Sequence, residues 1–235
     1  MSKQYWLVIF FIALLADIVI MQYGPDSLRI FSKPLIVLSL LAYLLNNSAG
    51  KKYVTVKILV AAALVFSIGG DVLLLFEPRS SLFFITGLVS FLIAHVFYII
   101  AFNTIRKKQS ISFRIIFLLP VLLYYILLVF VLFDSLHEMK IPVIIYGLVI
   151  SVMLAIALQL REMRDRTAVS LLISGALLFI ASDTMLAFNR FYAPWGSAGI
   201  EIMLTYGMAQ LFITISTVRI FHVQTIVKHK KVLAH

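Results

Sequence analysis

Two aspartates lie deep inside long apolar segments of this 235-residue chain. Asp71 occurs in SIGGDVLLLF, and Asp183 occurs in FIASDTMLAF, which has a small residue, an aspartate, a leucine and a final phenylalanine at matching places. A carboxylate at the centre of a membrane-spanning helix costs about 2.5–3.5 kcal/mol, so such residues usually face a polar cavity and mark a function. The two segments therefore predict one polar site that contains both carboxylates.

The chemistry expected of such a site is acid–base chemistry. Two carboxylates that share a low-dielectric pocket cannot easily both ionise, so one of them is expected to keep a proton. The pair then offers an acid and a base near neutral pH. This suits hydrolysis through an oxocarbenium-like intermediate, in which the acid delivers a proton and the base activates water. The sequence has no G-x-S-x-G, H-E-x-x-H or P-loop motif and no cysteine, which excludes a thiolate site.

The elements that must position these residues are membrane-spanning helices. Hydrophobic residues make up 63% of the chain, the mean hydropathy is +1.07, and only 13% of residues are charged, against about a quarter in soluble domains. A bilayer core needs about 20 apolar residues per helix. The sequence predicts an all-α polytopic membrane protein, a single transmembrane domain over residues 1–235, with eight spans at about 5–23, 31–46, 54–76, 82–103, 113–133, 141–160, 168–189 and 200–221.

The basic residues predict how these helices cross the membrane. With the N-terminus in the cytoplasm, 15 of the 20 Lys and Arg residues fall on the inner side and 5 on the outer side, as the positive-inside rule requires. Both termini are therefore predicted to be cytoplasmic. The net charge of +10 is then explained by topology and by contact with anionic headgroups rather than by nucleic acid. Short loops favour a bacterial cytoplasmic membrane.

This orientation places the acidic residues of the spans at one depth. Asp17, Asp71 and Asp183 fall in the outer portions of three outward-running helices, and Glu201 opens the eighth span from the same side. Both Asp17 and Glu201 also have structural explanations. Asp17, near a helix end, could simply reach the headgroups, and Glu201 lies in a first helical turn, where an acid favours the helix dipole. The two aspartate segments, each followed by an inward helix with a polar stripe, suggest a pseudo-repeat of two four-helix halves.

Further polar residues form candidate substrate contacts around the two aspartates. In the fourth span, His95 and Tyr98 lie on one face, and Tyr206 and Gln210 are four residues apart in the eighth. Hydrogen-bonded packing would equally explain His95, and anchoring at the membrane interface would explain the cations at span ends. The second span begins with Lys33 and the seventh ends with Asn189 and Arg190.

Several segments of the chain resemble the YhhN family of lysoplasmalogenases. The resemblance implies an eight-span membrane hydrolase that cleaves the vinyl-ether bond of a lysoplasmalogen into a fatty aldehyde and a glycerophospho-base. It also implies that Asp71 and Asp183 are catalytic and that no cofactor is required. The matching segments run in order along the chain: SKPL at 32–35, GDVLLLF at 70–76, GLVSFLIAHVFY at 87–98, IYGLVISVM at 145–153, SGALLFIASDTMLAFNRF at 174–191 and YGMAQLFI at 206–213.

The residues and the resemblance together give a working hypothesis. Asp71 and Asp183 act as acid and base, with the order of roles open. The expected partners are a lysophospholipid substrate and the membrane lipids, with no nucleic acid and no metal or other cofactor. The residues expected to orient water or substrate oxygen are His95, Tyr98 and Tyr206, those expected to contact the phosphate are Lys33 and Arg190, and Asn189 and Gln210 complete the substrate-binding set.

Two other function classes fit the same residues. One is a small proton-coupled transporter or lipid-binding protein, whose buried acids carry protons or bind a headgroup. The other is a different intramembrane lipid hydrolase, including a metal-dependent amidase with Asp and His ligands. Product analysis separates the first from a hydrolase, and sensitivity to chelators separates the second.

Overall fold

The computed structural model describes residues 4–232, and within them it contains eight long helices and no strand. All eight are long and apolar enough to cross a membrane, which confirms the predicted all-α architecture with eight spans. The chain is an integral, multi-pass membrane protein. The helices are α1 (Tyr5–Tyr23), α2 (Arg29–Asn46), α3 (Val54–Leu75), α4 (Ser81–Lys108), α5 (Leu118–Leu132), α6 (Lys140–Gln159), α7 (Arg166–Ala187) and α8 (Ala198–Val232).

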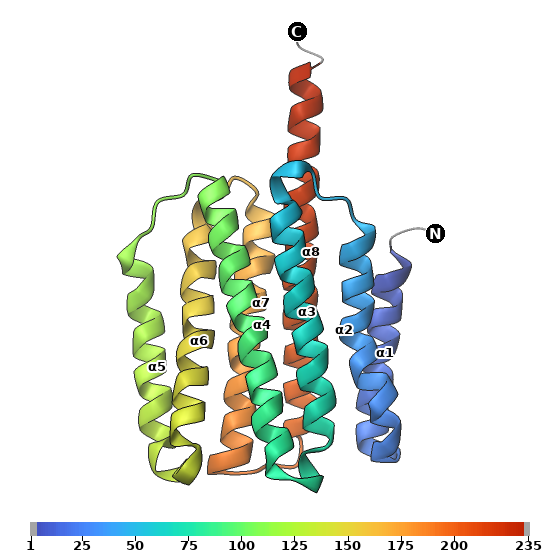
Figure 1. Cartoon of the computed structure of the whole chain (residues 1–235), viewed down its shortest axis with the longest axis vertical. Helices are drawn as coiled ribbons and strands as arrows, with labels where there is room; N and C mark the ends of the chain where they lie inside the picture. Colours follow the sequence, from blue (N-terminus) through green and yellow to red (C-terminus); the bar gives the residue numbers. More distant parts are fainter. Residues whose placement is uncertain (1–3, 233–235) are drawn as a thin grey trace.

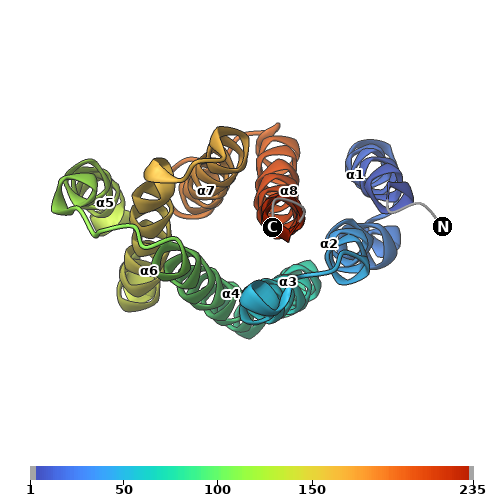
Figure 2. The same cartoon turned by 90° about the horizontal axis from the view of Figure 1, so that it is seen from above.

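The helices run alternately up and down, and α8 occupies the inside of the arrangement (Figures 1 and 2). Helix α8 contacts α7, α3, α2 and α1, whereas α5 lies at the edge and packs mainly on α6. The start of α1 and the end of α8 lie at the same end of the bundle (Figure 1). The side of the membrane on which that end lies, and the pseudo-repeat, stay predictions.

Glycines bring the central helices close together. A Cβ atom at Gly175 of α7 would lie 3.0 Å from the Ala209 carbonyl oxygen and 3.1 Å from the Ile213 nitrogen, both in the backbone of α8. Small residues are the usual means of such close approach between helices in membranes. At Gly70 of α3, a Cβ atom would lie 2.5 Å from the Phe91 ring of α4. These close approaches join α7 to α8 and α3 to α4. The four helices carry Asp71, Asp183 and His95.

Candidate active site

The three aspartates of the spans lie toward the end of the bundle opposite the C-terminus of α8. Helices α1, α3 and α7 run toward this end (Figure 1), and Asp17, Asp71 and Asp183 lie within about two turns of where these helices stop. Helices α2, α4, α6 and α8 begin at the same end. Seven helices therefore bring side chains to a similar depth.

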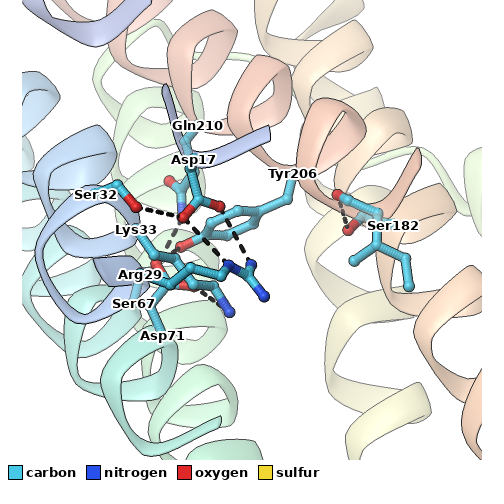
Figure 3. A network of polar contacts seen from close by, with 10 residues as sticks. Asp17, Arg29, Ser32, Lys33, Ser67, Asp71, Ser182, Tyr206 and Gln210 are labelled. Atoms are coloured by element: carbon cyan, nitrogen blue, oxygen red, sulfur yellow. Dashed lines mark hydrogen bonds and ion pairs between the residues drawn. The ribbon is translucent and has the colours of Figure 1, made fainter. Parts of the chain in front are cut away.

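Asp71 of α3 is buried and has partners on two other helices. The Tyr206 hydroxyl of α8 donates a hydrogen bond to Oδ2 at 2.7 Å, and the Lys33 ammonium of α2 lies 3.5 Å from Oδ1 (Figure 3). The Tyr206 ring packs edge-on against Phe91, with 5.8 Å between ring centroids. Because Gly70 leaves room for that Phe91 ring, the glycine preceding the aspartate helps to hold the tyrosine that binds it.

A second ion pair lies beside the first. Asp17 of α1 is fully buried and accepts hydrogen bonds from Arg29 Nε and Nη2 at 3.4 and 3.2 Å, and from Ser32 Oγ at 2.7 Å. Figure 3 shows this pair next to Lys33 and Asp71. Asp17 is thus part of a buried network rather than an exposed residue at a helix end. Arg29 and Lys33 are four residues apart, so one face of α2 supplies the cation for both carboxylates.

A second chain of hydrogen bonds lies next to this network. The Tyr98 hydroxyl of α4 donates to Gln210 Oε1 at 2.5 Å, and Gln210 Nε2 donates to Ser67 Oγ at 3.0 Å. All three side chains are buried. Ser67 lies one turn before Asp71, and Gln210 lies one turn after Tyr206. The predicted residues Tyr98 and Gln210 therefore link α4 and α8 directly next to the Asp71 site.

Asp183 of α7 lies in different surroundings. The Tyr146 hydroxyl of α6 donates to Oδ2 at 2.6 Å, and His95 Nε2 of α4 lies 3.8 Å from the same oxygen. His95 is buried, and its Nε2 has no hydrogen-bond partner. Among the ion pairs of residues 4–232, none joins Asp183 to a lysine or arginine.

One phenylalanine connects the surroundings of the two aspartates. The Phe179 ring lies 4.6 Å from the His95 ring and 5.5 Å from the Tyr206 ring, measured between centroids. His95 also packs edge-on against Tyr146 at 5.4 Å. The residues that contact Asp71 and Asp183 are therefore joined by one continuous set of aromatic contacts.

The other predicted contact residues have partners outside this cluster. Arg190 forms an ion pair with Glu77 at 3.0 Å, and Asn189 Oδ1 accepts from the Trp195 backbone nitrogen at 3.1 Å. Both lie in the short π-helix that follows α7. Glu201 is exposed at the start of α8. Substrate-binding roles for Asn189 and Arg190 stay predictions.

The residues of the network that were not among the predicted site residues include Tyr146 and Arg29, besides Ser32 and Ser67. Tyr146 binds Asp183, and Arg29 binds Asp17. A sequence pattern could have indicated Tyr146. Both tyrosines that donate a hydrogen bond to an aspartate are followed directly by a glycine, Gly147 or Gly207. Arg29 is one of the five basic residues predicted on the outer side, and its sequence position gives no sign of a buried partner, because a cation near a span end is equally typical of an interfacial anchor.

Comparison with known proteins identifies the family. The model of the YhhN family matches residues 28–217, which include both Asp71 and Asp183. The chain belongs to the YhhN family. A relative from Homo sapiens named lysoplasmalogenase TMEM86B is 34% identical over 161 residues, which are 68% of this chain and 64% of that protein. The protein of the same name from Sus scrofa is 32% identical over 192 residues, 82% of this chain and 76% of that protein.

The matches cover most of this YhhN chain but not the full length of its relatives. The aligned part spans just under two thirds of the human protein. No solved structure matches the chain. Within the part of this YhhN chain that the structure describes, no group of three or more His, Cys, Asp or Glu side chains is placed to hold a metal ion. The chemical groups at the site are two carboxylates, an imidazole, tyrosine hydroxyls and a lysine.

Proposed function

We propose that this protein hydrolyses the vinyl-ether bond of lysoplasmalogens and releases a fatty aldehyde and a glycerophospho-base. The relatives named lysoplasmalogenase support the substrate class. The observation that carries the chemistry is that Asp71, which is buried, and Asp183, whose side chain is 14% exposed, each accept a hydrogen bond from a tyrosine and are linked by aromatic contacts through Phe179. Carboxyl groups in such surroundings can give and take protons near neutral pH.

The proposed reaction begins with proton transfer from a carboxyl group to the vinyl carbon remote from the ether oxygen. The double bond's electrons form the new C–H bond, and the adjacent carbon becomes an oxocarbenium ion. Water then adds to this carbon and loses a proton to a carboxylate, which gives a hemiacetal. Breakdown of the hemiacetal breaks the C–O bond, and the hydroxyl proton moves to the departing oxygen. Asp71 and Asp183 are the carboxylates proposed to serve this reaction.

The proposed binding mode places the polar head at the end of the bundle where the aspartates lie. Lys33 and Arg190 are proposed to contact the phosphate, since their side chains lie at this end and are 13% and 46% exposed. The hydrocarbon chain would lie between helices, as expected of a lysolipid that enters from the bilayer. The residues proposed to orient water or the ether oxygen are His95, Tyr98 and Tyr206, with Gln210 holding Tyr98.

A panel of three lysolipids tests this proposal. The three would share headgroup and chain length and carry a 1-alkenyl, a 1-alkyl or a 1-acyl chain. We expect aldehyde from the alkenyl lipid and no product from the alkyl lipid, because a saturated ether has no double bond to protonate. Purified protein in detergent would be assayed by mass spectrometry. Fatty acid release from the acyl lipid without aldehyde from the alkenyl lipid would instead identify a different lipid hydrolase.

We also propose that both termini face the cytoplasm of a bacterial inner membrane, with the site opening on the outer side. The distribution of 15 against 5 basic residues supports this orientation. The cysteine-free chain allows a direct test with single cysteines at two exposed positions. A membrane-impermeant thiol reagent on intact cells is expected to label Ser80→Cys, at the site end, and not Ser48→Cys. The reverse labelling pattern would require the opposite orientation.

A further inference from the structure

We infer that the two aspartates have different roles: Asp183 transfers the proton with the help of His95, and Asp71 remains an anion that holds Lys33 and Tyr206. This assignment rests on the proposed hydrolysis and specifies how its site operates. It follows from the different partners of the two carboxylates.

Asp71 belongs to a charge-balanced set. Asp17, Arg29, Lys33 and Asp71 form two adjacent ion pairs, which contain two anions and two cations. Arg29 is committed to Asp17, so Asp71 is the counter-ion of the largely buried Lys33. Removing one partner of a buried ion pair leaves an uncompensated charge, which is strongly unfavourable. Protonation of Asp71 has the same effect on Lys33, so Asp71 is held as the anion throughout the reaction.

Asp183 has no such constraint. Its partners are the neutral hydroxyl of Tyr146 and the His95 ring. A buried carboxyl group without a cationic partner is favoured in its neutral form, because desolvation penalises the charge. Its side chain keeps 14% exposure, against 2% for Asp71, so substrate and water have better access to Asp183. The neutral acid is therefore at the accessible position.

His95 is proposed to position the water molecule that returns a proton to Asp183. In the proposed tautomer, the neutral ring carries its proton on Nδ1 and presents a lone pair at Nε2. This buried, unpartnered atom lies 3.8 Å from Asp183 Oδ2. Nε2 is closed to water in this structure, so a bridging water enters when the ring and the carboxyl group move apart, each then lying about 2.8 Å from the water oxygen. His95 thus orients the water that attacks the oxocarbenium carbon.

Asp183 alone both gives and regains the proton in this scheme. Asp183 gives its proton to the vinyl carbon and becomes a carboxylate. The attacking water, held by His95, gives a proton back to Asp183 as its oxygen bonds to carbon. The net change is addition of water to the vinyl ether, and the protonation of Asp71 does not change. Asp71 acts as a positioning residue for Lys33 and Tyr206.

The test compares Asp183→Asn, Asp71→Asn and the double variant Asp71→Asn/Lys33→Met, which restores the charge balance. We expect the double variant to regain at least about tenfold in kcat over Asp71→Asn, with a raised KM if Lys33 also contacts the phosphate. Its kcat should keep the wild-type pH profile, whereas Asp183→Asn should retain no more than about a thousandth of wild-type kcat. Wild-type protein without aldehyde release would refute the hydrolase itself.

Two results would overturn the division of roles while leaving the hydrolase intact. One is a double variant no more active than Asp71→Asn, which would mean that the carboxyl group of Asp71 is itself required. The other is an Asp183→Asn variant whose kcat stays within about tenfold of wild type, below the usual contribution of a general acid. Thermal unfolding in detergent establishes that each variant is folded. If Asp71→Asn alone fails to fold, the double variant is compared directly with wild type, and only a kcat within about a hundredfold and an unchanged pH profile support the proposal.

Discussion

The Asp183→Asn variant is expected to lower kcat for aldehyde release from lysoplasmalogen by about 10³-fold, within the range of general acid–base catalysis. The amide is nearly the same size as the carboxyl group and can still accept the hydrogen bond from Tyr146. It cannot deliver a proton to carbon, so the oxocarbenium ion does not form. The loss should therefore appear in kcat, with little change in KM.

A matched control separates this effect from the general consequence of removing a carboxylate. Asp134 is exposed at the end of α5, and Asp134→Asn is expected to retain wild-type kcat and KM. Asp183→Asn should unfold at the wild-type temperature or above it, because a group favoured in its neutral form is replaced by another neutral group. A folded Asp183→Asn protein with near wild-type turnover would remove this residue from the mechanism.

The Arg29→Met variant is expected to be destabilised by about 3–5 kcal/mol, the usual cost of leaving one member of a buried ion pair uncompensated. Asp17 is 0% exposed and would keep only the hydrogen bond from Ser32. The methionine fills most of the arginine's apolar volume, so the loss reports on charge rather than on packing. The midpoint of thermal unfolding in detergent is the measurement.

The double variant Asp17→Asn/Arg29→Met provides the internal check. With both charges removed, it is expected to recover most of the stability lost by Arg29→Met, since replacing a whole buried pair is often neutral. Arg164→Met, at an exposed position between α6 and α7, should be indistinguishable from wild type. If Arg29→Met and Arg164→Met unfolded at the same temperature, the Asp17–Arg29 pair would have no structural role.

The eight-helix architecture was predictable because hydropathy alone determines it. Apolar runs of about 20 residues have no other stable arrangement than membrane-spanning helices. The same reasoning identified Asp71 and Asp183, since a carboxylate within such a run must find polar partners. The sequence could also place Tyr98, Tyr206 and Gln210 on helix faces, and the structure shows all three in or next to the Asp71 site.

The pairing of each carboxylate could not be predicted, because it depends on how the helices pack. The chain contains 10 tyrosines, and helical periodicity does not say which of them faces α3 or α7. Arg29 shows the same difficulty. A cation at a helix start has the same sequence pattern whether it anchors at the interface or is buried, and only the position of α1 against α2 decides between the two.

The central claim is carbon protonation of a vinyl ether by this protein, and one isotope experiment tests it most directly. Purified protein would hydrolyse a lysoplasmalogen in D₂O enriched in oxygen-18, with both products analysed by mass spectrometry. We predict an aldehyde with one deuterium on the carbon next to the carbonyl, and a glycerophospho-base that keeps its original oxygen. Absence of aldehyde, or oxygen-18 in the glycerol, would contradict the account.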